Sequence, residues 1–130
     1  MNEISAYNFF KIYQTQINLR IIDVRDPYEY DAYHIENTSN IPLNLVLEKH
    51  FLFFNKKHHY FIICKNGIRS KQACIFLEQQ GYHVTNVFGG IERWEGDLVK
   101  GKGNSSKLNY LIPLLKKKKD NQNKSFFFSF

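Results

Sequence analysis

The most informative segment of the sequence is Tyr60-Phe61-Ile62-Ile63-Cys64-Lys65-Asn66-Gly67-Ile68-Arg69-Ser70. The apolar run at 60–63 is typical of a buried strand, which we expect to end at Cys64. Residues 65–70 form a tight polar turn, and the apolar spacing that follows predicts a helix from about Ser70 to the glycine at position 81. The strand therefore places a cysteine at its C-terminal end, where open α/β sheets bind their ligands.

A similar alternation of strands and helices extends on both sides of this stretch. We expect further strands at 19–24 and 82–88. Helical segments are expected after Ser5 as N-cap, at 28–33, at 43–54 and from position 91 onward, with a loop at 37–42. Strands that alternate with helices in this way predict an α/β fold with a parallel sheet.

The composition is that of one folded domain. At 130 residues, with 43% hydrophobic and 16% aromatic side chains, the chain is long enough to bury a core. It contains no run of about 18 apolar residues of the kind that spans a membrane, and its start does not resemble a secretory signal. The two cysteines, Cys64 and Cys74, are too few for a disulfide framework. These features indicate a reducing compartment, and we expect a cytoplasmic location.

The net charge of +6 is confined to the end of the chain. Residues 1–99 hold ten basic and eleven acidic side chains, whereas residues 100–130 hold eight lysines and one aspartate. We therefore divide the chain into a domain at 1–100 and a flexible linker with a basic and aromatic tail at 101–130, which we expect to be disordered. The domain lacks the basic face that nucleic-acid binding requires. For the tail, contact with nucleic acid or an anionic membrane is the alternative to a solvated extension.

The turn at 65–70 has features that activate a cysteine. It leads into a helix start, where unpaired N–H groups and the helix dipole favour an anion. Gly67 lets the backbone curl, Arg69 adds a permanent positive charge, and Ser70 can cap the helix and donate a hydrogen bond to the sulfur. All of these stabilise a thiolate, so Cys64 is a candidate nucleophile without an adjacent general base. A buried, unreactive cysteine is the alternative.

Four segments of the chain, in order, resemble the rhodanese (sulfurtransferase) family. The turn at 64–70 resembles the active-site loop of that family. Residues 22–26 with Glu29 and 34–35 resemble its first signature, and residues 40–42 resemble the continuation of that signature. The closing signature is matched by Ala73, Leu77, Gly81, Val87, Gly89, Gly90, Ile91 and Trp94. The resemblance covers about residues 3–98 of the chain.

The resemblance implies a central parallel sheet flanked by helices on both faces, and an enzyme that carries sulfur as a persulfide on Cys64. It implies that backbone amides of the loop bind the donor, so the candidate binding residues are Lys65, Asn66, Gly67, Ile68, Arg69 and Ser70. Lys65 and Arg69 are the candidates for an anionic donor. The implied donor is thiosulfate or a small-molecule or protein persulfide, and the implied acceptor is a thiol or cyanide. The resemblance implies no cofactor and no metal.

A non-catalytic binding or regulatory module with the same fold is the second hypothesis, and a phosphatase or arsenate reductase is the third. Loop length argues against the third, because four residues separate Cys64 from Arg69, whereas cysteine phosphatases have five. One residue fewer shortens the loop by roughly 3.3–3.6 Å, which suits a single sulfur atom better than a phosphate. The chain departs from the family pattern at Tyr33, Glu36 and Asn37, which border the expected pocket.

Other residues with suggestive chemistry are expected to be structural. Asp23 and Arg25 are expected to form an ion pair near the sheet edge, with substrate contact by Arg25 as the alternative. His34 is expected to fix its own loop, because no other cysteine or histidine lies at metal-ligand spacing. Cys74 and Trp94 are expected to lie in the core.

Overall fold

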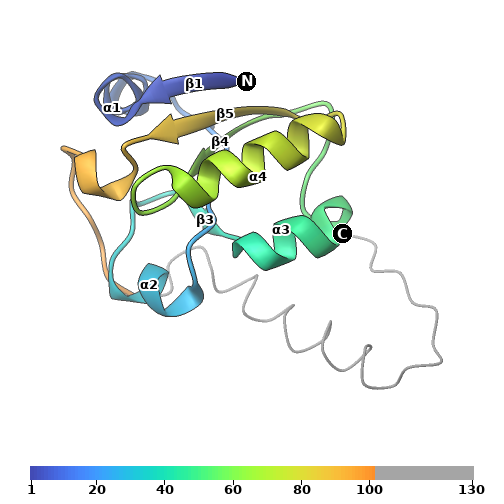
Figure 1. The fold of residues 1–130 in the computed structure, drawn as a ribbon. Helices are drawn as coiled ribbons and strands as arrows, with labels where there is room; N and C mark the ends of the chain where they lie inside the picture. Colours follow the sequence, from blue (N-terminus) through green and yellow to red (C-terminus); the bar gives the residue numbers. More distant parts are fainter. Residues whose placement is uncertain (102–130) are drawn as a thin grey trace.

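The computed structural model describes residues 1–101. Its centre is a five-stranded parallel sheet in the order β1-β5-β4-β2-β3 (Figure 1). The strands are β1 (Asn2–Ser5), β2 (Ile21–Asp23), β3 (Ser39–Asn40), β4 (His59–Ile63) and β5 (His83–Phe88). The helices are α1 (Ala6–Thr15), α2 (Pro27–Ala32), α3 (Leu43–Lys49) and α4 (Ile68–Gln79), with 3-10 turns η1 (His50–Leu52) and η2 (Ile91–Arg93). The predicted α/β fold with a central parallel sheet is confirmed.

Helices cover both faces of the sheet, as the family resemblance implies. One core cluster joins the sheet to α3 and α4, and includes Ile62 of β4 and Leu77 of α4. A second cluster joins the sheet to α1 and η2, and includes Ile63 of β4 and Phe9 of α1. β4 contributes to both clusters because successive side chains of a strand point to opposite faces. A strand that is buried on both faces is apolar along most of its length, which makes it recognisable in the sequence.

The helix α1 begins where the sequence predicts. Ser5 is its N-cap, and the Ser5 hydroxyl accepts a hydrogen bond from the amide of Asn8 at 3.0 Å. The buried face of the helix carries Phe9, whose ring centroid lies 4.9 Å from that of Phe61 and 5.9 Å from that of Trp94. These contacts confirm the expected place of Trp94 in the core.

Two of the strands are not predicted by the sequence. β1 precedes α1 and pairs with β5, with Asn2 beside Thr85. β3 lies within 37–42, which the sequence predicts as a loop, and pairs with β2 through Asn40 beside Asp23. Both strands are short and lie at the edges of the sheet, so they lack the apolar run that identifies β4.

The helix after the cysteine begins earlier than predicted. α4 starts at Ile68 with Gly67 as its N-cap, so the expectation that Ser70 caps the helix is wrong. Gly67 has a φ of 102°, a left-handed conformation that favours glycine. The segment from position 91 also differs from its prediction, because η2 is a single 3-10 turn rather than an α-helix.

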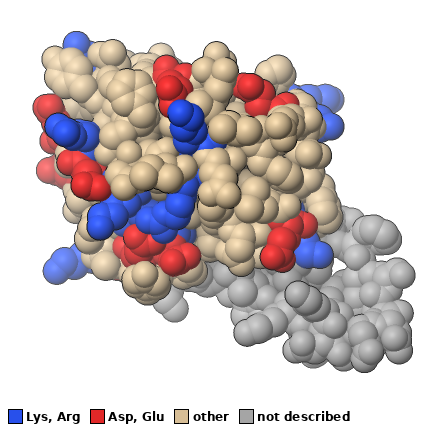
Figure 2. Space-filling view, in the orientation of Figure 1, with Lys and Arg blue, Asp and Glu red and all other residues tan. Residues whose placement is uncertain are grey.

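The surface of the domain carries both signs of charge. Figure 2 shows acidic and basic side chains interspersed among uncharged ones, and no basic area extends across the face in view. This pattern agrees with the near-neutral charge balance of residues 1–99. Across residues 1–101, no helix combines the length and apolar character needed to cross a membrane. The predicted disordered tail lies outside the described residues, apart from Gly101.

Candidate functional site

Cys64 lies directly after β4, at the carboxyl edge of the sheet. Its side chain is buried, and its sulfur faces the start of α4. The Sγ atom accepts hydrogen bonds from the amides of Gly67 at 3.1 Å and Ser70 at 3.3 Å, and lies 3.2 Å from the Ser70 hydroxyl oxygen. The turn therefore brings N–H groups of a helix start onto one sulfur, an arrangement that favours negative charge there.

The amides of the other loop residues point elsewhere or have no internal partner. The Ile68 amide donates to the side-chain oxygen of Asn66 at 3.1 Å. Among residues 1–101, the amides of Lys65 and Asn66 have no hydrogen-bond partner, which leaves them available to an incoming group. The side chains of Lys65, Asn66 and Ile68 are exposed around the loop. Of the predicted binding residues, Gly67 and Ser70 contact the sulfur directly.

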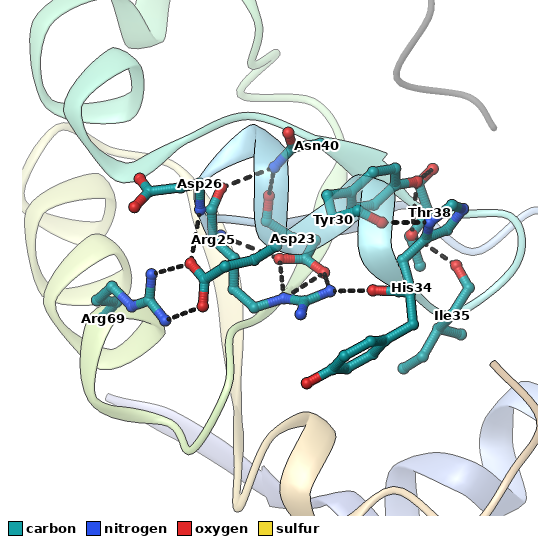
Figure 3. Close-up of polar contacts among 11 residues, drawn as sticks. Asp23, Arg25, Asp26, Tyr30, His34, Ile35, Thr38, Asn40 and Arg69 are labelled. Carbon is teal, nitrogen blue, oxygen red and sulfur yellow. Dashed lines mark hydrogen bonds and ion pairs between the residues drawn. The ribbon is translucent and has the colours of Figure 1, made fainter. Parts of the chain in front are cut away.

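Arg69 contacts a carboxylate that the sequence does not pair with it. Its guanidinium donates to both oxygens of Glu29 in α2, at 2.6 and 3.1 Å, and so joins the starts of two helices (Figure 3). Hydrogen bonding to Arg69 lowers the pKa of Glu29, and the same bonds raise the pKa of Arg69. The resemblance marks Glu29 as part of a signature, but nothing in its spacing shows which residue it contacts. The binding of an anionic donor by Arg69 stays a prediction.

The turn after β5 packs against the backbone of the cysteine loop. The amide of Ile91 donates to the carbonyl oxygen of Cys64, and the amide of Glu92 donates to that of Lys65, both at 2.9 Å. A Cβ atom on Gly90 would overlap the Cys64 carbonyl oxygen and lie 2.6 Å from that of Lys65, so this approach requires glycine. The sequence predicts a turn here but not its support of the loop. One feature of the sequence could have indicated this support: a glycine pair directly follows β5, a strand that ends at the same edge of the sheet as β4.

The expected ion pair between Asp23 and Arg25 is confirmed. Both side chains are 1% exposed, and the guanidinium donates to the carboxylate at 3.0 and 3.1 Å. Arg25 also donates to the carbonyl oxygen of Tyr33 at 2.7 Å. The side-chain amide of Asn40 donates to the carbonyl oxygens of both paired residues at 2.9 Å (Figure 3). Arg25 is thus buried with internal partners, which gives it a structural role.

His34 and Cys74 also have the structural roles that the sequence predicts. His34 Nδ1 lies 2.8 Å from the carbonyl oxygen of Tyr30, and the two rings stack with centroids 3.8 Å apart. Cys74 is buried on α4 in the core, and this burial raises the pKa of its thiol to about 12. Cys74 is therefore a neutral thiol at pH 7, which makes it a poor nucleophile.

A family model described as the rhodanese-like domain matches residues 10–97 of the chain. The chain belongs to the rhodanese-like domain family. The matched segment contains the cysteine loop, the helix α2 with Glu29, and the glycine turn that supports the loop. The family resemblance that the sequence shows is thereby confirmed.

Relatives of this rhodanese-like chain carry names that refer to sulfur transfer. The putative sulfurtransferase YtwF of Bacillus subtilis strain 168 is 32% identical over 97 residues, which is 75% of this chain and 93% of that protein. A sulfurtransferase of Allochromatium vinosum is 32% identical over 95 residues, which is 72% of this chain and 88% of that protein. The crystal structure of a rhodanese-like domain protein from Staphylococcus aureus superposes with a TM-score of 0.70 at 30% identity, and covers 77% of this chain and 98% of its own. These likenesses support a transferase that moves sulfur.

Proposed function

We propose that this chain is a sulfurtransferase that carries sulfane sulfur as a persulfide on Cys64. The donor is thiosulfate or a persulfide, and the acceptor is a thiol or cyanide. One observation supports the proposal above all others: the Cys64 sulfur lies 3.1 and 3.3 Å from two amides at the start of α4. Those amides stabilise the thiolate that the reaction requires.

The reaction has two half-reactions. The Cys64 thiolate attacks the outer sulfur of the donor and forms a new S–S bond. The S–S bond of the donor breaks, and its electron pair leaves on sulfite in the case of thiosulfate, or on a thiolate in the case of an alkyl persulfide. A thiolate or cyanide acceptor then attacks the outer sulfur of the Cys64 persulfide, which returns Cys64 as a thiolate. This ping-pong scheme consumes no cofactor.

We assign the binding of the donor to residues 65–70. The amides of Lys65 and Asn66, which have no partner among residues 1–101, are available to donor atoms. The exposed side chain of Lys65 adds a positive charge beside the loop. A cytoplasmic location fits this chemistry, because a reducing compartment keeps both cysteines as thiols, and Cys64 and Cys74 are both free in the structure.

Intact-mass analysis tests the proposal. Treatment with thiosulfate or an alkyl persulfide is expected to add the mass of one sulfur atom, and cyanide is expected to remove it as thiocyanate. Cys64→Ala should take up no sulfur. Cys74→Ala, which removes the buried thiol outside the loop, should still take it up. An unchanged mass of the wild-type chain with both donors would contradict the proposal and favour a non-catalytic binding module.

A further inference from the structure

The carboxylate of Glu29 is held in place from two sides. Its Oε1 atom accepts from Arg69 at 2.6 Å and from the amide of Asp26 at 3.0 Å, and its Oε2 atom accepts from Arg69 at 3.1 Å. The bond to Asp26 belongs to the capping box that starts α2. The side chain of Glu29 is 17% exposed and that of Arg69 is 32% exposed, so the ion pair is only partly screened by water. The helix α2 thus presents a fixed anion to the cation of the cysteine loop.

This pairing changes the charge that a donor meets. Arg69 lies in the turn that binds the sulfur, directly before Ser70, whose amide donates to the Cys64 sulfur at 3.3 Å. The two terminal nitrogens of the Arg69 guanidinium donate to the two carboxylate oxygens of Glu29 in a bidentate, edge-to-edge contact. Lys65 is the other cation of the loop, and its side chain is exposed to solvent. The charge of Arg69 is therefore largely cancelled where the donor would bind.

The two classes of donor differ in the charge that they bring to this site. Thiosulfate is a dianion, and its attack by the Cys64 thiolate gathers three negative charges, which end on the Cys64 persulfide and on sulfite. An alkyl persulfide is at most a monoanion at its sulfurs, so the same step gathers two negative charges, which end on the Cys64 persulfide and on the departing thiolate. A site whose arginine is already neutralised stabilises two charges better than three.

We propose that Glu29 is a specificity-determining residue that withholds Arg69 from dianionic donors, and that the chain therefore prefers alkyl persulfides to thiosulfate. The inference rests on the proposed sulfurtransferase function and narrows its donor class. Glu29 acts through Arg69 and does not itself contact the sulfur, so it is a positioning residue.

The test compares the two donors in wild type and in Glu29→Gln. Glutamine can keep the bond to the Asp26 amide, because capping boxes accept Glu or Gln at this position, but it cannot neutralise Arg69. The probes are thiosulfate and 2-hydroxyethyl persulfide, whose charge lies only on its sulfurs. We expect wild type to use the persulfide with the higher kcat/KM. In Glu29→Gln, KM for thiosulfate should fall roughly fivefold, the effect of about 1 kcal/mol for a released surface charge.

Two controls connect the effect to the ion pair. Glu48→Gln removes the same charge from an exposed position on α3, and it should leave the ratio of the two kcat/KM values at the wild-type level. In the double variant Glu29→Gln with Arg69→Gln, the decrease in KM for thiosulfate should disappear. The decrease in the thiosulfate KM should also become smaller as salt is added, since salt screens the attraction between Arg69 and the dianion.

The outcomes separate this inference from the function on which it rests. Sulfur uptake from neither donor would overturn the proposed function. Uptake from both donors, with wild type using thiosulfate at least as well as the persulfide, would overturn the inference alone, and this measurement needs no variant. An unchanged thiosulfate KM in folded Glu29→Gln would overturn it as well.

Discussion

The amide of Ile91 donates a hydrogen bond to the carbonyl oxygen of Cys64 across 2.9 Å, and this bond ties the turn after β5 to the residue after β4. The two strands are neighbours in the sheet, so their carboxyl ends bring the two segments together. The position of the sulfur therefore depends on a segment outside the cysteine motif as well as on the helix start.

Gly90→Ala tests that dependence. The new Cβ would overlap the Cys64 carbonyl oxygen, and Gly90 has a φ of 54° and a ψ of −151°, which a residue with a side chain tolerates poorly. We expect a loss of about 3 kcal/mol or more in the free energy of unfolding, measured with urea. Gly101→Ala is the matched control: Gly101 also has a positive φ, but no atom of residues 1–101 outside its immediate neighbours lies within 4 Å of its Cβ position. That control should lose only about 1–2 kcal/mol, and equal losses would argue against the packing contact.

Arg25→Met is expected to destabilise the fold strongly. It would leave the Asp23 carboxylate, which is 1% exposed, without its counter-ion. Removing one partner of a buried ion pair typically lowers the free energy of unfolding by about 3–5 kcal/mol. The double variant Asp23→Leu with Arg25→Met should lose less of this free energy, because no buried charge remains. Arg20→Met, at an exposed position, serves as the control in the same denaturation series. A loss below about 1 kcal/mol in Arg25→Met would be inconsistent with a structural ion pair.

Cys74 is expected to resist alkylation in the folded chain. Its thiol has a pKa of about 12 because it is buried, so almost none of it is thiolate between pH 6 and 9. Peptide mapping after iodoacetamide treatment should find label at Cys64 but not at Cys74, whereas both should be labelled in denaturant. Rapid labelling of Cys74 in native protein would show that α4 opens readily.

Stability should fall with acid in a way that depends on Glu29. Its pKa is lowered in the fold, first by hydrogen bonding to Arg69, relative to an ordinary glutamate value of about 4.3. A lowered carboxyl pKa stabilises the fold above the unfolded-state pKa, and this stability is lost as pH falls through the lower folded-state value. Wild type should therefore lose more stability than Glu29→Gln between about pH 5 and pH 2 in urea titrations. Glu48→Gln should follow wild type, and parallel curves for all three proteins would show that the ion pair contributes nothing.

The parts of the fold that were predictable are those encoded by neighbouring residues. The strand β4, Cys64 and the turn after it follow one another in the sequence and are recognised together. The N-cap at Ser5 is likewise recognised from the residues next to it. The sequence predicts the start of α4 too late because serine is a common N-cap, whereas Gly67 caps α4 through its left-handed backbone rather than through a side chain.

The remaining features depend on contacts between distant residues. β1 has little apolar character of its own, and it becomes a strand because β5 offers it a partner. The contact of Arg69 with Glu29 spans 40 residues, and the sheet order determines that α2 and α4 start side by side. A single sequence contains both residues but no indication of their distance.

The pairing of β1 with β5 has a consequence for synthesis on the ribosome. Among the strands of residues 1–101, the first to be synthesised pairs with the last, so residues 2–5 cannot pair until residues 85–88 emerge. At roughly 5–20 residues per second this delay is about 4–16 seconds. From the emergence of β4 until β5 follows it, the nascent chain holds an apolar strand with one of its two edges unpaired, which is the stage at which a stalled chain is most prone to strand pairing with other chains.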